Sequence, residues 1–562
     1  MSQTAFGIQA EYVDAWGVPR KANPDTVRLL RKALGAGGRS RPGRPRTPEP
    51  GGAGNAPGCH LPRGTQAWGW AAQLYAVRSQ RSWGIGDLGD LRRLADWSQG
   101  VGAGFIQINP LHASAPAGPQ QASPYFPSSR RFRNPLYIAV EEVPGYRAVA
   151  VELAGIAARA RELNQARLID RDAVLPLKLQ ALEAIWEAGP PRRGLDAWAT
   201  AAGPALKTYG TYCALAERHG ADWRAWPGRL RWPASAIDSP DAREVHARAQ
   251  FHVWLQWLLD RQLERAARVV RPICDLAIGA DPAGADAWIW SDLLVPGFTV
   301  GAPPDELNLA GQNWGFPAFN PQALVEVGFA PFRETVRAGM AHALGLRIDH
   351  VMGLFRLWMI PHGASGTDGA YLTYPAAPML DILAQESQAA GALVIGEDLG
   401  TVQPEVRQEL RRRRVLSYRL LWFEERPPRR YPRRALAAVT THDLPTVAGL
   451  WSGSDQRSMD AAGLHPNLAA SRAIMERMSH LTGVRAGGPP GLAVLGAYRA
   501  LCRSPSRLLA ATLEDALVVA ERPNMPGTVD EWPNWSIALP GGLEGLRRSK
   551  SAGHLAGIMS GR

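Results

Sequence analysis

Short apolar runs bounded by glycine or polar residues recur along the chain and alternate with stretches of helical periodicity. Apolar runs of about four to eight residues are typical of strands buried in a parallel sheet. We predict strands at residues 71–77, 105–109, 272–278, 343–350, 392–397, 415–422, 436–441 and 516–521. Eight strands mostly separated by helices predict an α/β fold, a (β/α)8 TIM barrel, with a doubly wound open sheet as the alternative.

A long helical segment interrupts this alternation after the second predicted strand, between about residues 145 and 270. Phe251, Trp254, Leu255 and Leu258 are its clearest example, because their spacing places them on one side of a helix. Core packing explains these side chains better than a ligand site does. We therefore predict a helical insertion in the barrel after strand two.

The two ends of the chain differ from the barrel region. Residues 1–34 predict a short ordered extension with a helix that has Pro24 at its first position. Residues 35–65 are rich in glycine, proline and arginine and have little to bury, which predicts a disordered linker. The barrel domain is expected at residues 66–540, and residues 541–562 are expected to form a poorly ordered tail.

Three of the predicted strands lead into a carboxylate. Glu397 stands in Gly-Glu-Asp-Leu-Gly, Asp349 in Leu-Arg-Ile-Asp-His, and Asp443 directly after Thr-Thr-His. The carboxyl ends of the strands of a barrel gather at one rim, so we expect Asp349, Glu397 and Asp443 to converge there. Such a set of carboxylates is what the transfer of a sugar between hydroxyl groups requires.

The neighbours of these carboxylates indicate their roles. Side chains alternate along a strand, so Arg347 and Asp349 share a face, and the guanidinium should lower the pKa of Asp349 and favour an ionised nucleophile. A structural Arg–Asp pair is the alternative. A general acid needs a raised pKa, which the apolar run and the nearby carboxylates would give Glu397. Alternation turns Asp398 to the other face, although this segment alone could equally be a tight turn. Asp443 would bind sugar hydroxyls and stabilise the transition state.

The net charge of +12 would suit a nucleic-acid partner, but its distribution argues against one. Arginine carries nearly all of the positive charge, and the densest runs, 411–414 and 429–434, are separated by an apolar segment without interleaved aromatic residues. No run of about 18 apolar residues predicts a membrane span, and the start of the chain lacks the pattern of an export signal. We expect a cytoplasmic protein without nucleic-acid or membrane partners.

No cofactor or metal ion is expected. The four cysteines are widely spaced and form no ligand pair, and no second histidine-rich segment could complete a metal site with His442 and Asp443. Residues 84–89 match the dinucleotide fingerprint, but residues 78–83 intervene where the fingerprint requires a tight turn. No acidic residue follows at 105–109 to bind a ribose. A loop near the sugar site is the preferred interpretation.

Ten short segments together resemble the 4-α-glucanotransferases (amylomaltase, or disproportionating enzyme), relatives of the α-amylase barrel enzymes. They run in the family's order across about residues 66–535. The segments are 82–87 (SWGIGD), 123–125 (SPY), 134–136 (NPL), 284–288 (GADAW), 303–305 (PPD), 311–315 (GQNWG), 346–353 (LRIDHVMG), 396–401 (GEDLGT), 441–446 (THDLPT) and 522–528 (RPNMPGT).

The resemblance implies the same three roles, with Asp349 as nucleophile, Glu397 as acid/base and Asp443 as transition-state stabiliser. It also implies that the subsite for the attacked glucose is lined by Tyr125, Asp286, Arg347 and His442. Trp314 resembles an aromatic platform for the neighbouring sugar, with a core tryptophan as the alternative, and Asn524 resembles a further substrate-binding residue. The chain departs from longer relatives by lacking their β-rich N-terminal domains, and it has Ser536 where the family usually has a basic residue.

The sequence therefore predicts a retaining transglycosylase that moves α-1,4-glucan segments between maltooligosaccharides through a covalent glycosyl-aspartate. An α-glucan hydrolase on the same barrel and a catalytically inactive glucan-binding protein are the alternatives, and a basic RNA-binding protein is a more remote one. The number of subunits stays open.

Overall fold

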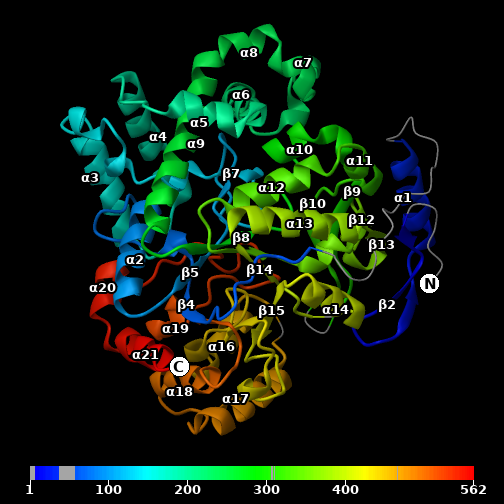
Figure 1. The fold of residues 1–562 in the computed structure, drawn as a ribbon, viewed down its shortest axis with the longest axis vertical. Coiled ribbons are helices and arrows are strands. Elements are labelled where there is room, and N and C mark those ends of the chain that lie inside the picture. The colour runs from blue at the N-terminus through cyan, green and yellow to red at the C-terminus, as the bar shows by residue number, and fades with distance from the viewer. Residues whose placement is uncertain (1–6, 37–56, 306–307, 309, 401, 465) are drawn as a thin grey trace.

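The computed structural model describes residues 7–36, 57–305, 308, 310–400, 402–464 and 466–562 (Figure 1). Eight parallel strands close into a barrel at its centre. In chain order they are β4 (Ala67–Ala72), β5 (Phe105–Ile108), β8 (Pro272–Leu276), β11 (Gly345–Ile348), β14 (Leu393–Gly396), β15 (Leu416–Leu420), β16 (Ala435–Ala438) and β17 (Leu508–Thr512). Each strand pairs with the next, and β17 pairs with β4 to close the ring. The predicted TIM barrel is confirmed, and the open-sheet alternative is wrong.

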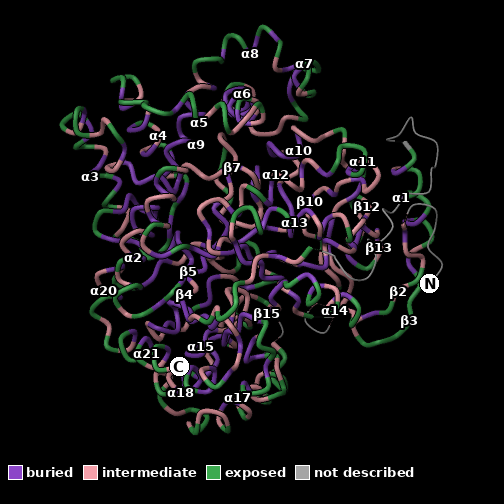
Figure 2. The backbone as a smooth tube through the Cα atoms, in the orientation of Figure 1, coloured by how far each residue is buried: buried purple, intermediate pink, exposed green. Residues whose placement is uncertain are grey.

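Side chains fill the inside of the barrel. Leu393 and Ile395 on β14 stand two residues apart, as do Leu416 and Tyr418 on β15, so alternation sends each pair to one face. The packed set comprises Phe105, Ile273, Leu393, Ile395, Leu416, Tyr418, Leu420, Leu436, Ala438, Leu508 and Ala510. Figure 2 shows the buried backbone concentrated around the barrel, with exposed segments on the outer helices. Because the interior is packed, a substrate cannot occupy the barrel itself, and the rim is the place to look for a site.

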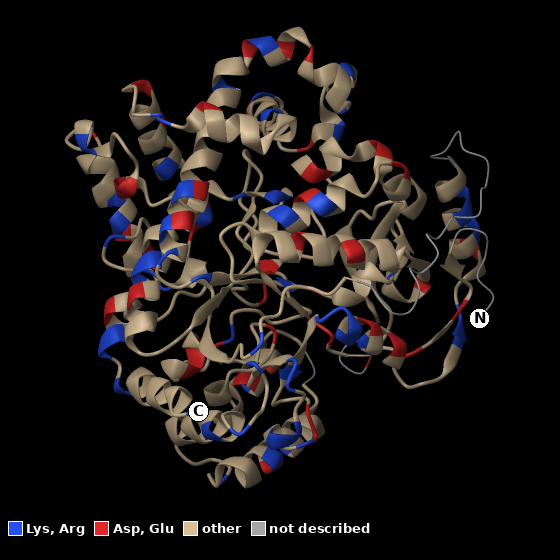
Figure 3. Ribbon diagram, in the orientation of Figure 1, with Lys and Arg blue, Asp and Glu red and all other residues tan. Residues whose placement is uncertain are grey.

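Helices surround this core. They include α2 (Leu88–Gly100), α9 (His246–Ala267), α12 (Ala330–Met340), α13 (Ala376–Ala390), α14 (Pro404–Arg412) and α18 (Pro490–Leu501). Figure 3 shows basic and acidic residues interspersed along their ribbons. In the arginine-rich run, Arg412 and Arg413 both form ion pairs with Glu409. None of the helices in the described part of the chain is both long and apolar enough to cross a membrane.

The predicted helical insertion is confirmed and forms the upper part of Figure 1. It lies between β5 and β8 and consists of α3 (Ala154–Glu162), α4 (Arg171–Glu187), α5 (Leu195–Ala202), α6 (Pro204–His219), α7 (Pro233–Ile237), α8 (Pro240–Glu244) and α9. On α9, Phe251, Trp254, Leu255 and Leu258 are all buried, as their spacing predicted.

A second, five-stranded sheet stands beside the barrel on the side of α1 (Pro24–Ala36). Its order is β1 (Ile8–Gln9), β13 (Ala370–Thr373), β12 (Arg356–Pro361), β9 (Phe298–Ala302) and β10 (Gln312–Phe316), all antiparallel. The extension at the start of the chain therefore contributes the edge strand β1, and its expected helix is α1. The sheet carries Trp314 on its opposite edge, β10.

Two of the predicted barrel strands are misplaced. Residues 516–521 are not a strand, since the eighth strand is β17 and the chain turns into α19 (Leu513–Ala516) directly after it. The hydroxyl of Thr512 accepts a hydrogen bond from the backbone of Asp515 and so starts this turn. The first strand spans Ala67–Ala72, and Leu74–Ala76 forms a 3₁₀ turn where strand was predicted.

The predicted poorly ordered tail is wrong. It forms α20 (Gly542–Arg548) and α21 (Lys550–Ser560), and α21 packs against α18. Most of the predicted linker, residues 37–56, lies outside the described residues. Its last part is held in place, because Cys59 is buried and its backbone N–H donates to the carbonyl of Arg413 over 2.8 Å.

Candidate active site

Strand register brings Asp349 and Glu397 together at the carboxyl rim of the barrel. Ile348 on β11 pairs in parallel with Gly396 on β14, so the residues that follow them stand side by side. The backbone N–H of His350 donates to Glu397 Oε2 over 3.0 Å, and that of Leu399 donates to Oε1 over 2.8 Å. The carboxyl group of Glu397 is thus held partly by the loop that carries Asp349.

The predicted pairing of Arg347 with Asp349 is confirmed. Arg347 Nη2 lies 3.1 Å from Asp349 Oδ1, and the guanidinium is buried. Its Nη1 also contacts both oxygens of Asp275, at 2.7 and 2.8 Å. Asp398 faces away, as predicted, since its Oδ1 accepts from the backbone N–H of Tyr418 over 2.9 Å and its side chain is buried.

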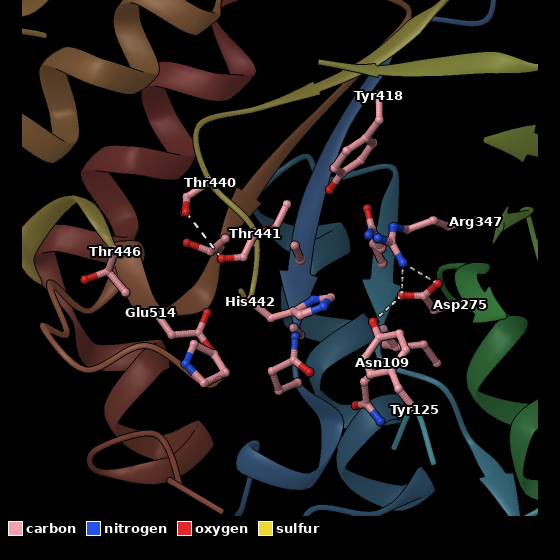
Figure 4. A pocket seen from close by; sticks show the side chains of 17 residues that line it. Asn109, Tyr125, Asp275, Arg347, Tyr418, Thr440, Thr441, His442, Thr446 and Glu514 are labelled. Atoms are coloured by element: carbon pink, nitrogen blue, oxygen red, sulfur yellow. Dashed lines mark hydrogen bonds and ion pairs between the residues drawn. The ribbon is translucent and has the colours of Figure 1, made fainter. Parts of the chain in front are cut away.

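Asp275, which the sequence interpretation missed, occupies the place expected for Asp286. Tyr125 donates its hydroxyl to Asp275 Oδ2 over 2.6 Å, so this carboxylate joins Tyr125 to Arg347 (Figure 4). Asp286 instead accepts from the hydroxyl of Ser129 and the backbone of Arg130 at the start of α10 (Ala285–Ile289). Asp275, and not Asp286, lines the same hollow as Tyr125, Arg347 and His442, and its position on strand three was the available signal.

Asp443 stands in the loop after β16 and is held from three sides. His442 Nε2 lies 3.2 Å from Asp443 Oδ2, and the Asn524 side-chain amide donates to Oδ1 over 2.7 Å. Arg522 donates to the backbone carbonyl of Asp443 over 3.2 Å. The Asn524 backbone N–H also donates to the carbonyl of His442 over 3.1 Å. Asn524, predicted as a substrate-binding residue, therefore positions the Asp443 carboxylate.

Three aromatic rings meet beside Asp443. The ring of Tyr125 lies 5.0 Å from that of His442 and 5.2 Å from that of Trp535, and the last two rings are 5.1 Å apart. Trp535 is buried and was not predicted to be part of the site. Trp314 is half-buried on β10, with its ring 5.3 Å from the imidazole of His350, the residue after Asp349. It thus lies beside the rim.

The electrostatics of the three carboxylates differ. Burial raises the pKa of Asp349 to about 7, with the carboxylates of Asp275, Glu397 and Asp443 adding to it, and the guanidinium of Arg347 offsets only part of the rise. The expected net lowering of this pKa is therefore wrong. Burial also raises the pKa of Glu397, as predicted. For Asp443, burial is outweighed by the charge and hydrogen bond of His442 and by the Asn524 amide, so its pKa is lowered.

An open hollow with about 540 Å³ of free space, which we call the rim hollow, is lined by Arg347 and His442, the residues that contact Asp349 and Asp443 (Figure 4). Tyr125, Asp275, Arg347 and His442 line one part of it, together with Tyr418. Its remaining walls are formed by Ala71, Ala72, Gln73, Gln107, Ile108, Asn109, Thr440, Thr441, Thr446, Thr512, Glu514 and Pro523. Its polar lining suits a polyhydroxylated ligand.

Neither a metal nor a dinucleotide site is evident in the part of the chain that the structure describes. No three His, Cys, Asp or Glu side chains of these residues are grouped to hold a metal ion. In the glycine-rich segment 84–89, Asp87 caps α2 by accepting from the backbone of Gly89 and Asp90. A Cβ at Gly86 would lie 2.0 Å from the carbonyl of Leu74, so this glycine serves close packing.

Comparison with known proteins agrees with this geometry. The family model for 4-alpha-glucanotransferase matches residues 72–543. The chain belongs to the 4-alpha-glucanotransferase family. A 4-alpha-glucanotransferase of Mycobacterium tuberculosis is 44% identical over 528 residues, covering 85% of this chain and 72% of that protein. One of Haemophilus influenzae is 35% identical, covering 84% of this chain and 75% of that protein.

A solved structure supports the same assignment. The amylomaltase of Corynebacterium glutamicum superposes with a TM-score of 0.84 at 28% identity, covering 99% of this chain and 98% of that one. The match includes the barrel and extends over almost all of both chains. This 4-alpha-glucanotransferase is thus an enzyme that acts by transglycosylation on α-1,4-glucans, the activity of its family.

Proposed function

We propose that this 4-alpha-glucanotransferase moves segments of maltooligosaccharides by a retaining double displacement through a covalent bond to Asp349. The observation that carries the proposal is the register of β11 and β14, which sets Asp349 beside Glu397. Two neighbouring carboxyl groups are the arrangement of retaining glycosidases, in which the groups stand about 5–5.5 Å apart. Asp443 comes from a third strand end, and its charge acts on Asp349.

In the first step, Glu397 gives its proton to the glycosidic oxygen while Asp349 attacks the anomeric carbon. The bond between the anomeric carbon and the leaving oxygen breaks, and a glycosyl ester with Asp349 forms. In the second step, the carboxylate of Glu397 takes the proton of an acceptor's 4-hydroxyl. That oxygen attacks the anomeric carbon and displaces Asp349, so the two inversions retain the configuration.

The protonation states required by these steps fit the surroundings. Burial favours one shared proton on the Asp349–Glu397 pair, because two adjacent buried carboxylates repel each other. Arg347 contacts Asp349 directly, whereas the carboxyl group of Glu397 accepts from the backbone N–H groups of His350 and Leu399. We therefore assign the proton to Glu397 and the charge to Asp349. Asp443, with its lowered pKa, is ionised and can stabilise positive charge on the sugar ring.

The aromatic side chains support sugar binding on either side of the cleaved bond. The rings of Tyr125, His442 and Trp535 form one wall, on which the apolar face of a glucosyl ring can pack. Trp314 stands beside His350 and would hold the neighbouring sugar. An acceptor bound there competes with water for the glycosyl ester, which favours transfer over hydrolysis.

Incubation with maltotriose alone tests this function. We expect glucose together with maltopentaose and longer oligomers, detected by chromatography of the products. Glucose and maltose alone would instead indicate a hydrolase. A preparation of Asp349→Asn, purified in parallel, controls for contaminating activity and should release no product.

A further inference from the structure

One acidic side chain at the rim has no part in the mechanism described above. Glu514 follows β17, lines the rim hollow and is only 7% exposed. Within the described residues, its own backbone N–H is the one group that donates a hydrogen bond to its carboxyl. A buried carboxyl with so few hydrogen-bond partners destabilises a fold, so its presence in a wall of the hollow calls for a ligand.

The next residue, Asp515, is a buried carboxylate with a structural role and serves as a comparison. Asp515 is fully buried, accepts from the backbone N–H of Val447 over 2.9 Å and from the hydroxyl of Tyr498 over 2.8 Å. It thereby ties the end of β17 to α15 (Val447–Trp451) and α18. Glu514 lies in the wall of the hollow near His442 instead (Figure 4). Asp515 is therefore hydrogen-bonded inside the fold, whereas Glu514 faces the hollow.

Gln73 is a second polar side chain in the wall of the rim hollow with unmet hydrogen-bonding capacity. Thr512 on β17 pairs with Ala71 on β4, and Glu514 and Gln73 each come two residues later, just after these neighbouring strands end. Gln73 also lines the rim hollow, and its Oε1 is buried without a hydrogen-bond partner among the described residues. The same holds for Oε1 of Gln107, which lies on the next strand, β5.

We propose that Glu514 and Gln73 bind hydroxyl groups of the glucosyl unit that occupies the rim hollow. This inference rests on the proposed function, and it adds a polar wall formed by strands one and eight to the wall formed by Tyr125 and His442. A sugar hydroxyl both donates and accepts, and a carboxyl beside an amide offers both kinds of partner. Binding would give a partner to the Gln73 amide oxygen, which has none among the described residues, and further partners to the Glu514 carboxyl.

The protonation of Glu514 suits the binding of a sugar hydroxyl. Burial raises its pKa to about 7, with Asp515 adding to the rise and His442 opposing it. Near neutral pH the carboxyl therefore has a substantial protonated fraction and can donate as well as accept. Its contact with a neutral sugar then needs no buried counter-ion.

The decisive variants are Glu514→Leu and Gln73→Leu, which remove the polar groups at similar volume. We expect each to lower kcat/KM for maltotriose disproportionation about tenfold or more, because one hydrogen bond to the sugar is lost. Their thermal unfolding temperatures should stay equal to that of the parent or rise, since an unsatisfied buried group is removed. Asp515→Leu is the matched comparison and should lower the unfolding temperature.

Donors that lack single hydroxyls on the transferred glucosyl unit identify the contact. One deoxygenation should lower kcat/KM of the parent about tenfold yet have little further effect in Glu514→Leu, because the partner is already absent. The inference is overturned if both variants keep the parent's kcat/KM within about twofold, or if every deoxygenation acts independently of Glu514. The proposed function fails separately, and this inference with it, if the parent performs no transfer on maltotriose.

Discussion

The backbone N–H of His350 donates to Glu397 Oε2 over 3.0 Å, which joins the residue after Asp349 to the carboxyl group of Glu397. His350 has a left-handed backbone, with φ of 44°, and this conformation belongs to the turn that presents the N–H. The positions of Asp349 and Glu397 are thus linked through one turn as well as through the pairing of their strands.

Replacement of His350 tests this link. His350→Val should lower the free energy of unfolding by about 1–3 kcal/mol and reduce kcat, because a β-branched residue does not tolerate the left-handed region. His350→Gly removes the same imidazole but accepts the backbone, so it should unfold at a higher temperature than His350→Val and be the more active of the two. Thermal unfolding and initial rates with maltotriose measure both effects. Equal behaviour of the two variants would contradict the role of the turn.

The covalent intermediate should be observable when Glu397 cannot act as a base. With α-maltosyl fluoride, whose leaving group needs no protonation, Glu397→Gln should still be glycosylated but should react with acceptors slowly. Mass spectrometry of the intact protein and of its peptides should locate the maltosyl group on Asp349. Asp349→Asn serves as the control and should stay unmodified. A label found on another carboxylate would assign the nucleophile elsewhere.

The pH dependence of kcat/KM should follow the charges around Asp349. The proposed mechanism requires an ionised Asp349 and a protonated Glu397, so the profile should be a bell whose acidic limb reports the raised pKa of this pair. The charge of Arg347 lowers the pKa of Asp349 against the effect of burial. Arg347→Met should therefore move the acidic limb to higher pH and lower kcat/KM about 100-fold or more.

Asp275→Asn should shift the acidic limb in the opposite direction. The charge of Asp275 adds to the rise that burial produces in the pKa of Asp349, so its removal lets Asp349 ionise at lower pH. The shift should be visible despite the weaker anchoring of Arg347. Measurement of kcat/KM over the whole profile for both variants checks the sign, and shifts in the same direction would refute the assignment.

The last helix should be needed for stability. Leu555 on α21 is fully buried in the main hydrophobic core, whereas its neighbour His554 is exposed. Leu555→Ala should lower the free energy of unfolding by about 2–5 kcal/mol, the usual result of removing a buried leucine side chain. His554→Ala should change it by less than about 0.5 kcal/mol. Denaturant unfolding of both variants tests whether the tail packs as described.

The pattern of apolar residues in the sequence correctly located the strands that precede Asp349 and Glu397. The apolar runs before Asp349 and Glu397 are short, closed by polar residues or glycine, and buried on both faces, and each of these properties is visible in sequence. The face of Asp398 also followed from alternation. Alternation within one strand cannot predict which residue of another strand will contact Arg347. Asp275 does so because it lies on the neighbouring strand β8.

The misplaced segments have a related cause. Residues 516–521 are as apolar as the true strand at 508–512, and only the pairing of β17 with β16 and β4 decides between them. The tail was predicted to be poorly ordered because its apolar residues gain a role only in the folded protein. There α20 packs against α2, and α21 packs against α18. The net pKa of Asp349 depends on how deeply the rim is buried, a property of the assembled barrel.

The start of the chain has a structural importance out of proportion to its length. Ile8 and Gln9 pair with β13, and the side chains of Asn23 and Thr26 hydrogen bond Asp368 in the loop between β12 and β13. Without this segment, β13 would present its unpaired backbone to other molecules, an edge that invites intermolecular strand addition. Removal of this segment should therefore promote aggregation through the exposed edge of β13. That strand belongs to the sheet that carries Trp314.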